Sequence, residues 1–295
     1  MTPLTRRTFL GSTAAVASSA AMAMAADESD QDTSSLGRTP HTRFAVNVEM
    51  WWRKLDFLDR IRKAAEFGFP AIEFWPWRDR DIDAVAGLSE DLNLAIAQFT
   101  AWPFNPGMND PANHDAVVKE VQASCRVAQR LKCKKMTVVG GNDQPGMTQR
   151  QMHANIIKAL KRAAPIAEQH DVMLILEPMN IRVDHKGHCL YGSPDAVRIC
   201  REVGSTHVKI NWDLYHMQIS EGDLCGRLAE GFDQVGYLQL ADHPGRNEPG
   251  TGEVHYNRVL RQAYELGYRD YVGLECVPKT TELAAAKGVA AADAW

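Results

Sequence analysis

Features that would point to several other kinds of protein are missing from this 295-residue sequence. Its six cysteines contain no pair with C-x-x-C spacing, which argues against a cysteine-based zinc site. Basic residues form no stripe with interleaved aromatics and the net charge is −4, so we expect no nucleic-acid partner. No glycine-rich phosphate turn follows the first predicted strand, which argues against a dinucleotide-binding doubly wound sheet.

The N-terminus has the pattern of a targeting segment. The stretch TRRTFL at residues 5–10 carries paired arginines before a short, alanine-rich apolar run and a small-x-small site at residues 23–25. We predict a twin-arginine signal peptide over residues 1–25, a flexible linker over 26–41 and one catalytic domain over 42–295. An ordinary secretory signal or a membrane anchor is the alternative. The prediction implies a periplasmic or secreted protein with no stable membrane span after cleavage.

The rest of the sequence alternates between short apolar runs and amphipathic stretches. Eight strands with seven clear crossovers predict a (β/α)8 TIM barrel, and the continuous apolar runs suit strands buried on both faces. A doubly wound sheet is the alternative. The predicted strands are 44–48, 71–75, 94–99, 135–139, 172–177, 208–213, 235–239 and 271–275. The predicted helices are 54–67, 82–92, 114–131, 148–170, 193–203, 222–231, 256–266 and, weakly, 280–294; a long loop is expected over 100–113.

Each of the last four apolar runs ends in an oxygen-bearing side chain. These are Glu177, Asp213, Gln239 and Glu275, at gaps of 36, 26 and 36 residues, each about the length of one βα unit. Consecutive parallel strands place their C-terminal ends on one rim, so the four side chains should converge. Converging carboxylates repel unless a cation lies between them. An all-oxygen ligand set favours Mg²⁺ or Mn²⁺ over Zn²⁺.

Other polar and aromatic residues lie close to these strand ends. His216 and His243 should face the same pocket, although each could be a hydrogen-bonded loop histidine. Arg246 is a candidate clamp for a substrate carboxylate or hydroxyl, the alternative being a surface pair with Glu248. His185 and His188 could line a lid. Five tryptophans follow the first three strands and predict an aromatic wall, or ordinary rim packing: Trp51, Trp52, Trp75, Trp77 and Trp102.

Three stretches resemble the hydroxypyruvate isomerase family, a branch of the xylose isomerase-like TIM barrels. They are LEPMN (176–180), DLYHMQ (213–218) and QLADHPGRNEPGTGE (239–253). The resemblance implies paired catalytic glutamates, Glu177 and Glu275, and a metal held by Glu177, Asp213, Gln239 and Glu275. We further predict substrate contacts from Asn180, His216, His243 and Arg246. Relatives in the ketose 3-epimerase branch have a histidine where Gln239 stands, which argues against that branch.

The resulting expectation is a metal-dependent isomerase of a small hydroxy-keto acid or sugar, acting by enediolate proton transfer between two glutamates. A keto-sugar 3-epimerase or sugar dehydratase of the same fold is one alternative. An exported sugar-binding protein without catalysis is another, of a different class. The expected partner is a small molecule, and a homodimer is possible for barrels of this family.

Overall fold

The computed structural model describes residues 32–295. Residues Ser34–Trp295 form one compact unit. The predicted signal peptide over 1–25 lies outside the described residues, as does the first part of the predicted linker. The folded unit begins ahead of the predicted boundary at residue 42, because the Gly37 N–H donates to the Phe67 carbonyl and Gly37 is buried.

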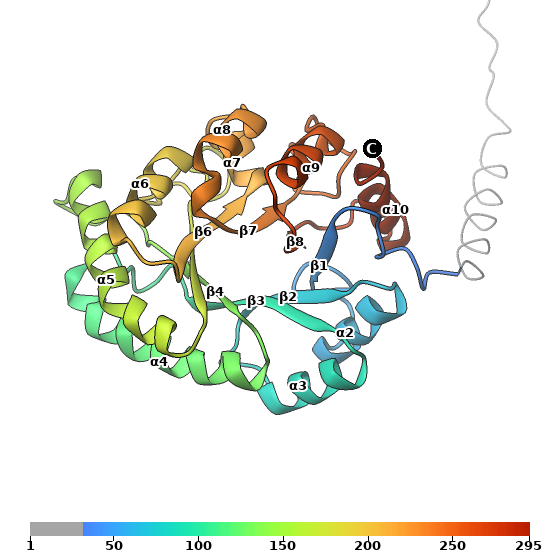
Figure 1. Cartoon of the computed structure of the whole chain (residues 1–295), viewed down its shortest axis with the longest axis horizontal. Coiled ribbons are helices and arrows are strands. Elements are labelled where there is room, and N and C mark those ends of the chain that lie inside the picture. The colour runs from blue at the N-terminus through green and yellow to red at the C-terminus, as the bar shows by residue number, and fades with distance from the viewer. Residues whose placement is uncertain (1–31) are drawn as a thin grey trace, which may run out of the picture. The chain divides into compact units, whose positions relative to one another are not determined.

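Eight parallel strands close into a barrel in the order β1 to β8, with β1 pairing β8 (Figure 1). This confirms the (β/α)8 prediction and rules out an open doubly wound sheet. β4 and β5 show why the chain forms strands here, since their short apolar runs are almost wholly buried. The strands are β1 Arg43–Asn47, β2 Ala71–Pro76, β3 Ala95–Trp102, β4 Lys135–Val139, β5 Met173–Glu177, β6 Val208–Asp213, β7 Val235–Leu240 and β8 Tyr271–Leu274.

Helices between the strands form the outer layer of the barrel (Figure 1). They are α2 Phe57–Glu66, α3 Ile82–Asp91, η2 Pro111–Asn113, α4 His114–Arg130, α5 Gln149–Gln169, α6 Ser193–Val203, α7 Leu214–Ser220, α8 Leu224–Gly231, η3 Phe232–Gln234, α9 Tyr256–Glu265 and α10 Glu282–Ala292. α5 begins at a capping box in which Thr148 and Gln151 satisfy each other's backbone N–H groups. α4 buries Val117, Val121 and Ala128, which recur at helical spacing on one face.

The observed elements depart from the predicted ones most clearly in β3 and α7. β3 continues to Trp102, because Thr100 and Trp102 still pair with β4, so the long loop begins three residues later than 100. α7 was not predicted: Asp213 both ends β6 and caps α7 with no loop between them. The weakly predicted last helix exists as α10, capped by the Thr281 side chain.

The barrel interior changes from apolar to polar along its axis. An apolar cluster of Ala45, Ala71, Ala97, Ile175 and Tyr237 fills one layer. A connected set of buried polar side chains crosses the same interior, and we call it the polar belt. Its members are Asn47, Glu73, Gln98, Thr137, Asn211 and Gln239.

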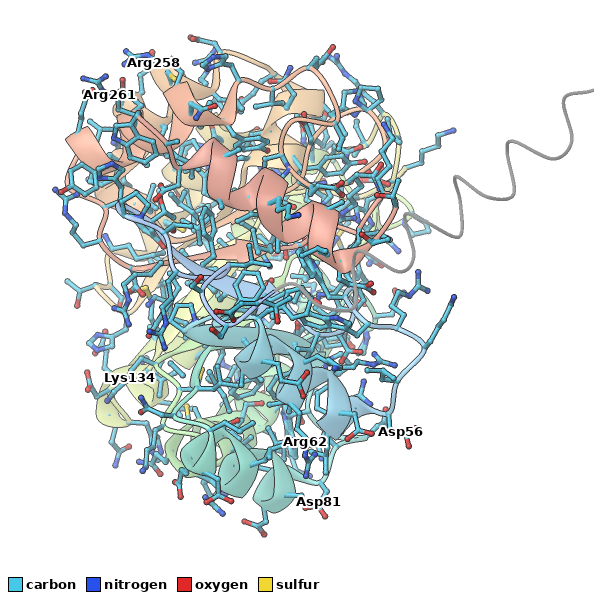
Figure 2. The ribbon with its side chains drawn as sticks, turned by 90° about the vertical axis from the view of Figure 1, so that its right-hand side faces the viewer. Asp56, Arg62, Asp81, Lys134, Arg258 and Arg261 are labelled. Carbon is cyan, nitrogen blue, oxygen red and sulfur yellow. The ribbon has the colours of Figure 1, made fainter. Side chains whose placement is uncertain are left out.

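Charged side chains occupy the outside of the helical layer. Arg62, Lys134, Arg258 and Arg261 point outward in Figure 2. Each of them pairs with an acid: Arg62 with Asp59, Lys134 with Asp171, and both Arg258 and Arg261 with Glu265. Within residues 32–295, no helix is long and apolar enough to cross a membrane.

Candidate active site

Three carboxylates from three strands meet at the C-terminal rim of the barrel. Glu177 ends β5, Asp213 ends β6 and Glu275 follows β8. One ligand atom from each, together with one from His216 on α7, lies within 4.8 Å of the others. All four residues are buried. The predicted convergence of these three acids is therefore present, because parallel strands in one barrel end on one rim.

Burial and mutual repulsion disfavour the charged forms of these acids. Desolvation, followed by the charges of Glu275 and Asp213, raises the pKa of Glu177 well above its usual value. The pKa of Asp213 is raised for the same two reasons, burial and the charge of Glu275. Full ionisation of the cluster is therefore unfavourable by itself, and a cation bound among the carboxylates would offset the repulsion.

Arg246 supplies the nearest positive charge. Its Nη2 donates to Glu275 Oε2 at 2.7 Å and lies 3.8 Å from Asp213 Oδ2. Burial lowers the pKa of Arg246, but the charges of Glu275, Asp213 and Glu177 outweigh this and raise it. The alternative pairing with Glu248 is not found, since Glu248 accepts from the Lys279 N–H. Arg246 therefore belongs to the carboxylate cluster.

Asn180 determines the protonation of His216. The Asn180 Oδ1 accepts from the backbone N–H groups of Val183 and Asp184, which fixes the orientation of its amide. Its Nδ2 then donates to His216 Nδ1 at 2.7 Å, so the neutral ring carries its proton on Nε2. Burial, followed by the charge of Arg246, lowers the pKa of His216 well below its usual value. His216 therefore presents an N–H donor toward Asp213 and Glu177, at 3.5 and 3.7 Å, rather than a free lone pair.

Gln239, the fourth predicted ligand, lies in the polar belt. Its Nε2 donates to Glu73 Oε1 at 2.8 Å, and its Oε1 accepts from Asn211 Nδ2 at 2.6 Å. A carbonyl oxygen has two lone pairs, so one remains for another partner. Its role as a metal ligand stays a prediction.

A cavity of about 330 Å³ opens beside the cluster. Glu177, His216, Arg246 and Glu275 line one part of it. The remaining lining is mainly apolar and comes from the ends of β2 and β4 and from the loops after β3 and β5: Trp75, Pro76, Pro103, Phe104, Val139 and Met179. This size is at the lower end of the range for small-molecule sites, roughly 300–1,000 Å³.

The other predicted site residues are distributed between this cavity and the packing around it. Of the five tryptophans, Trp75 lines the cavity, while Trp51, Trp52 and Trp102 are buried in the core and Trp77 donates to Ser124. The expected aromatic wall is thus reduced to one tryptophan. 

The three other predicted histidines differ in whether they line the cavity. His185 lines the cavity, stacked 4.8 Å from Phe104. His188 is buried beneath it, and His243 lies 6.0 Å from the Tyr215 ring and does not line the cavity. The substrate contact of His243 remains a prediction.

Two residues at the site, Glu73 and Asn211, were not singled out from the sequence. The hydrogen bond of Trp75, whose Nε1 donates to Glu275 Oε1 at 2.8 Å, was not predicted either. Glu73 is fully buried and accepts from Asn47, Tyr237 and Gln239; its burial, followed by the charge of Glu275, raises its pKa to about 7. Asn211 binds Gln239. A polar residue inside an apolar strand, as in AIEFW and VKINW, was the available signal.

Residues 61–294 match a protein family described as the xylose isomerase-like TIM barrel. The chain belongs to this family. Within it, the chain is similar to the hydroxypyruvate isomerase of Escherichia coli, with 34% identity over 245 residues that cover 81% of this chain and 95% of the relative. It is also 30% identical over 244 residues to the 2-oxo-tetronate isomerase of Cupriavidus necator, covering 80% and 93%. The resemblance to the hydroxypyruvate isomerase family is confirmed, and the chain belongs to a family of isomerases.

A solved structure has the same barrel fold as this chain. An AP endonuclease, family 2 from Brucella melitensis superimposes with a TM-score of 0.78 at 27% identity, covering 83% of this chain and 96% of that one.

The residues of the cluster fit a divalent metal ion. Asp213 Oδ2 is buried and has no hydrogen-bond partner, although its other oxygen accepts from the Tyr215 N–H. An unpaired buried carboxylate oxygen is costly unless a cation or proton satisfies it. Glu177 and Glu275 provide two further hard oxygens, which suit Mg²⁺ or Mn²⁺.

Proposed function

We propose that this protein is a metal-dependent isomerase that moves a proton between adjacent carbons of a hydroxy-keto acid or sugar. The observation that carries the proposal is the group of three buried carboxylates, one with an orphaned oxygen, beside a neutral histidine donor at the cavity. Relatives named for hydroxypyruvate and 2-oxo-tetronate isomerisation support the reaction class. Glu177, Asp213, Gln239 and Glu275 would hold Mg²⁺ or Mn²⁺.

Each residue has a defined part in this reaction. A bound divalent ion would polarise the substrate carbonyl and stabilise the developing enediolate. One of Glu177 and Glu275 takes the proton from one carbon, and the other returns a proton to the neighbouring carbon. The His216 Nε2–H donates to a substrate oxygen, with Asn180 holding the ring in the required tautomer. Arg246 binds a substrate hydroxyl or carboxylate at the same end of the cavity.

We also propose export by the twin-arginine pathway, on the strength of the TRRTFL stretch. This route carries folded proteins, so a metal could be loaded before export.

The decisive experiment measures exchange of substrate C–H protons with ²H₂O by NMR, using metal-loaded protein with hydroxypyruvate and keto-sugars. Glu177→Gln and Glu275→Gln should each slow exchange at least about 100-fold, since each removes a proton-transfer group. Glu253→Gln, an exposed glutamate in the loop after β7, is the matched control and should exchange normally. Wild-type rates in either active-site variant would refute the two-glutamate scheme.

A further inference from the structure

The guanidinium of Arg246 contacts the same carboxylates that suit a divalent ion. Its Nη2 donates to Glu275 Oε2 at 2.7 Å and lies 3.8 Å from Asp213 Oδ2, the buried oxygen without a hydrogen-bond partner. Glu177 completes the group, since one of its oxygens lies within 4.8 Å of the ligand atoms of Asp213 and Glu275. Arg246 is therefore the counter-ion of the acids that would hold the metal.

The other oxygens of Asp213 and Glu275 already have donors. Asp213 Oδ1 accepts from the Tyr215 N–H, and Glu275 Oε1 accepts from Trp75 Nε1 at 2.8 Å. A metal ion and Arg246 would thus share Asp213 Oδ2 and Glu275 Oε2. Two cations at the same buried oxygens repel each other, and a buried site screens this repulsion less than water does. Each cation should therefore weaken the binding of the other.

The side chain of Arg246 is held less firmly than its backbone. A guanidinium has five N–H donors, and the Arg246 Nε–H is buried without a hydrogen-bond partner. The backbone, by contrast, is fixed. Its carbonyl accepts from the Val277 N–H, and Asp242 accepts from several backbone N–H groups of the same loop. A displacement of the guanidinium would therefore involve the side chain and leave the loop in place.

Tyr215 and the cavity offer the guanidinium a second position. Its central carbon lies 5.0 Å from the centroid of the Tyr215 ring, inside the limit of about 6 Å for a cation–π contact. Arg246 also lines the cavity, and 20% of its side chain is exposed. The guanidinium can therefore leave Glu275, keep its contact with the ring and reach the space in which a substrate would lie.

We propose that Arg246 competes with the divalent ion for Asp213 and Glu275, so that ion binding transfers its guanidinium from the carboxylates to the cavity. Arg246 thereby lowers the metal affinity of the cluster. Its release supplies a donor to the substrate once the ion is in place, so metal binds before substrate. This inference rests on the proposed metal-dependent function and specifies how metal and substrate binding are coupled.

A purely structural role for Arg246 leads to a different expectation. If the guanidinium only held the site together, its removal would lower both the thermal stability and the metal affinity. Competition predicts changes of opposite sign. Removal leaves the carboxylates without their nearest cation, which lowers the Tm in EDTA, but it also abolishes the repulsion that opposes the ion.

Mn²⁺ binding to the full-length chain, measured by EPR of the free ion, tests the competition without turnover. Arg246→Gln should bind Mn²⁺ at least about tenfold more tightly than the wild type, since like charges a few ångströms apart interact strongly at a buried site. Its Tm in EDTA should be lower. Arg246→Lys keeps a positive charge and should bind more weakly than Arg246→Gln.

Arg258→Gln is the matched control. It makes the same change in net charge on α9, where Arg258 points outward (Figure 2). Its Mn²⁺ affinity should equal that of the wild type.

The movement of the side chain is measured separately, by NMR of ¹⁵N-arginine-labelled wild type. The Arg246 Nε–H signal is assigned by its absence from Arg246→Lys, and it should shift when diamagnetic Mg²⁺ is added. The Arg258 signal should stay in place. If Arg246→Gln does not fold, this titration decides the question.

The outcomes separate this inference from the function on which it rests. Equal or weaker Mn²⁺ binding by folded Arg246→Gln would overturn the inference and leave the metal-dependent function standing. So would an Arg246 signal that does not change at saturating Mg²⁺. Absence of Mn²⁺ binding from the wild type and from every variant would overturn the proposed function and this inference with it.

Discussion

The buried amide of Asn180 determines which nitrogen of His216 carries the proton. The amide cannot turn over without losing its two bonds from the Val183 and Asp184 N–H groups. His216 Nδ1 therefore accepts, and Nε2 remains the donor toward the carboxylates. A hydrogen bond made by one ring nitrogen of a histidine commonly sets the role of the other.

Replacing Asn180 with aspartate should reverse the tautomer. In Asn180→Asp an acceptor faces Nδ1, so the proton moves there and Nε2 loses its donor role. We expect turnover to fall roughly 100-fold, the usual loss when one oxyanion donor is removed. ¹⁵N NMR of the His216 ring reads the tautomer directly in both proteins. An Nδ1–H form in the wild type would contradict this assignment.

His188 should make the stability of the fold depend on pH. It is buried, its Nε2 accepts from the Gly141 N–H, and its Nδ1 donates to the Leu190 carbonyl. Burial lowers its pKa to about 4, so the unfolded chain takes up the proton first as the pH falls. Above about pH 6.5 His188 is neutral in both the folded and the unfolded chain. Between about pH 6.5 and pH 4 its protonation in the unfolded chain should lower the free energy of unfolding by roughly 3 kcal/mol.

Denaturant unfolding between pH 4 and pH 7 measures this effect. His188→Gln, which has no proton to gain in this range, should show a smaller fall in the free energy of unfolding. His170→Gln, at the C-terminal end of α5, is the control and should follow the wild type. Parallel wild-type and His188→Gln curves would exclude the assigned role.

At the level of elements, the loop from Asp242 to Val254 after β7 owes its shape to one carboxylate. Asp242 Oδ1 accepts from His243 and Val254, and its Oδ2 accepts from Gly250 and Gly252. The loop carries Arg246, and its carbonyl at Arg246 accepts from the Val277 N–H. Asp242 therefore fixes the position of Arg246, although Asp242 itself does not contact the carboxylate cluster.

Asp242→Asn should loosen this loop. The replacement turns an NH₂ group toward two backbone N–H groups, and hydrogen bonds to a charged group contribute about 1.5–3 kcal/mol each. We expect a lower Tm, faster proteolysis within residues 242–254 and a raised KM. Glu253→Gln, which changes an exposed carboxylate of the same loop, is the control. Equal cleavage rates in the two variants would show that Asp242 is not the organising residue.

At the scale of the whole molecule, closing the barrel creates the charge imbalance at its rim. Glu177, Asp213 and Glu275 are far apart in the sequence, and the fold brings them together at a cost in repulsion and desolvation. An ion that binds the folded state alone would relieve this cost.

Adding Mn²⁺ or Mg²⁺ to EDTA-treated protein should therefore raise the Tm. A free metal concentration of 100 times Kd stabilises the folded state by about 2.7 kcal/mol. For a domain of this size, that corresponds to a rise in Tm of roughly 5–10 °C. Asp213→Asn should lose most of the shift, because it removes the carboxylate with the orphaned oxygen. Calorimetric scans of both proteins with and without metal provide the measurement, and an unchanged wild-type Tm would count against a metal site.

Predictions from the sequence succeeded where one local signal suffices. Strand ends such as Glu177 and Asp213 were located from apolar runs, since burial on both faces requires continuous apolar sequence. α7 was missed because Asp213 ends a strand and caps a helix with no turn residues to mark the change. Trp51, Trp52 and Trp102 were placed near the rim, but whether a ring faces a cavity or the core depends on neighbours distant in the sequence.

The sequence by itself determined the alternating order of strands and helices, the barrel that follows from it, and which acids share a rim, because period and spacing are properties of a chain. Only the tertiary structure decided which groups touch. The tautomer of His216, the pairing of Arg246 with Glu275 and the bond from Glu73 to Gln239 join residues from different strands and loops. Hydrogen bonds and desolvation act over a few ångströms in space, and the distances that control them are set by the closed barrel.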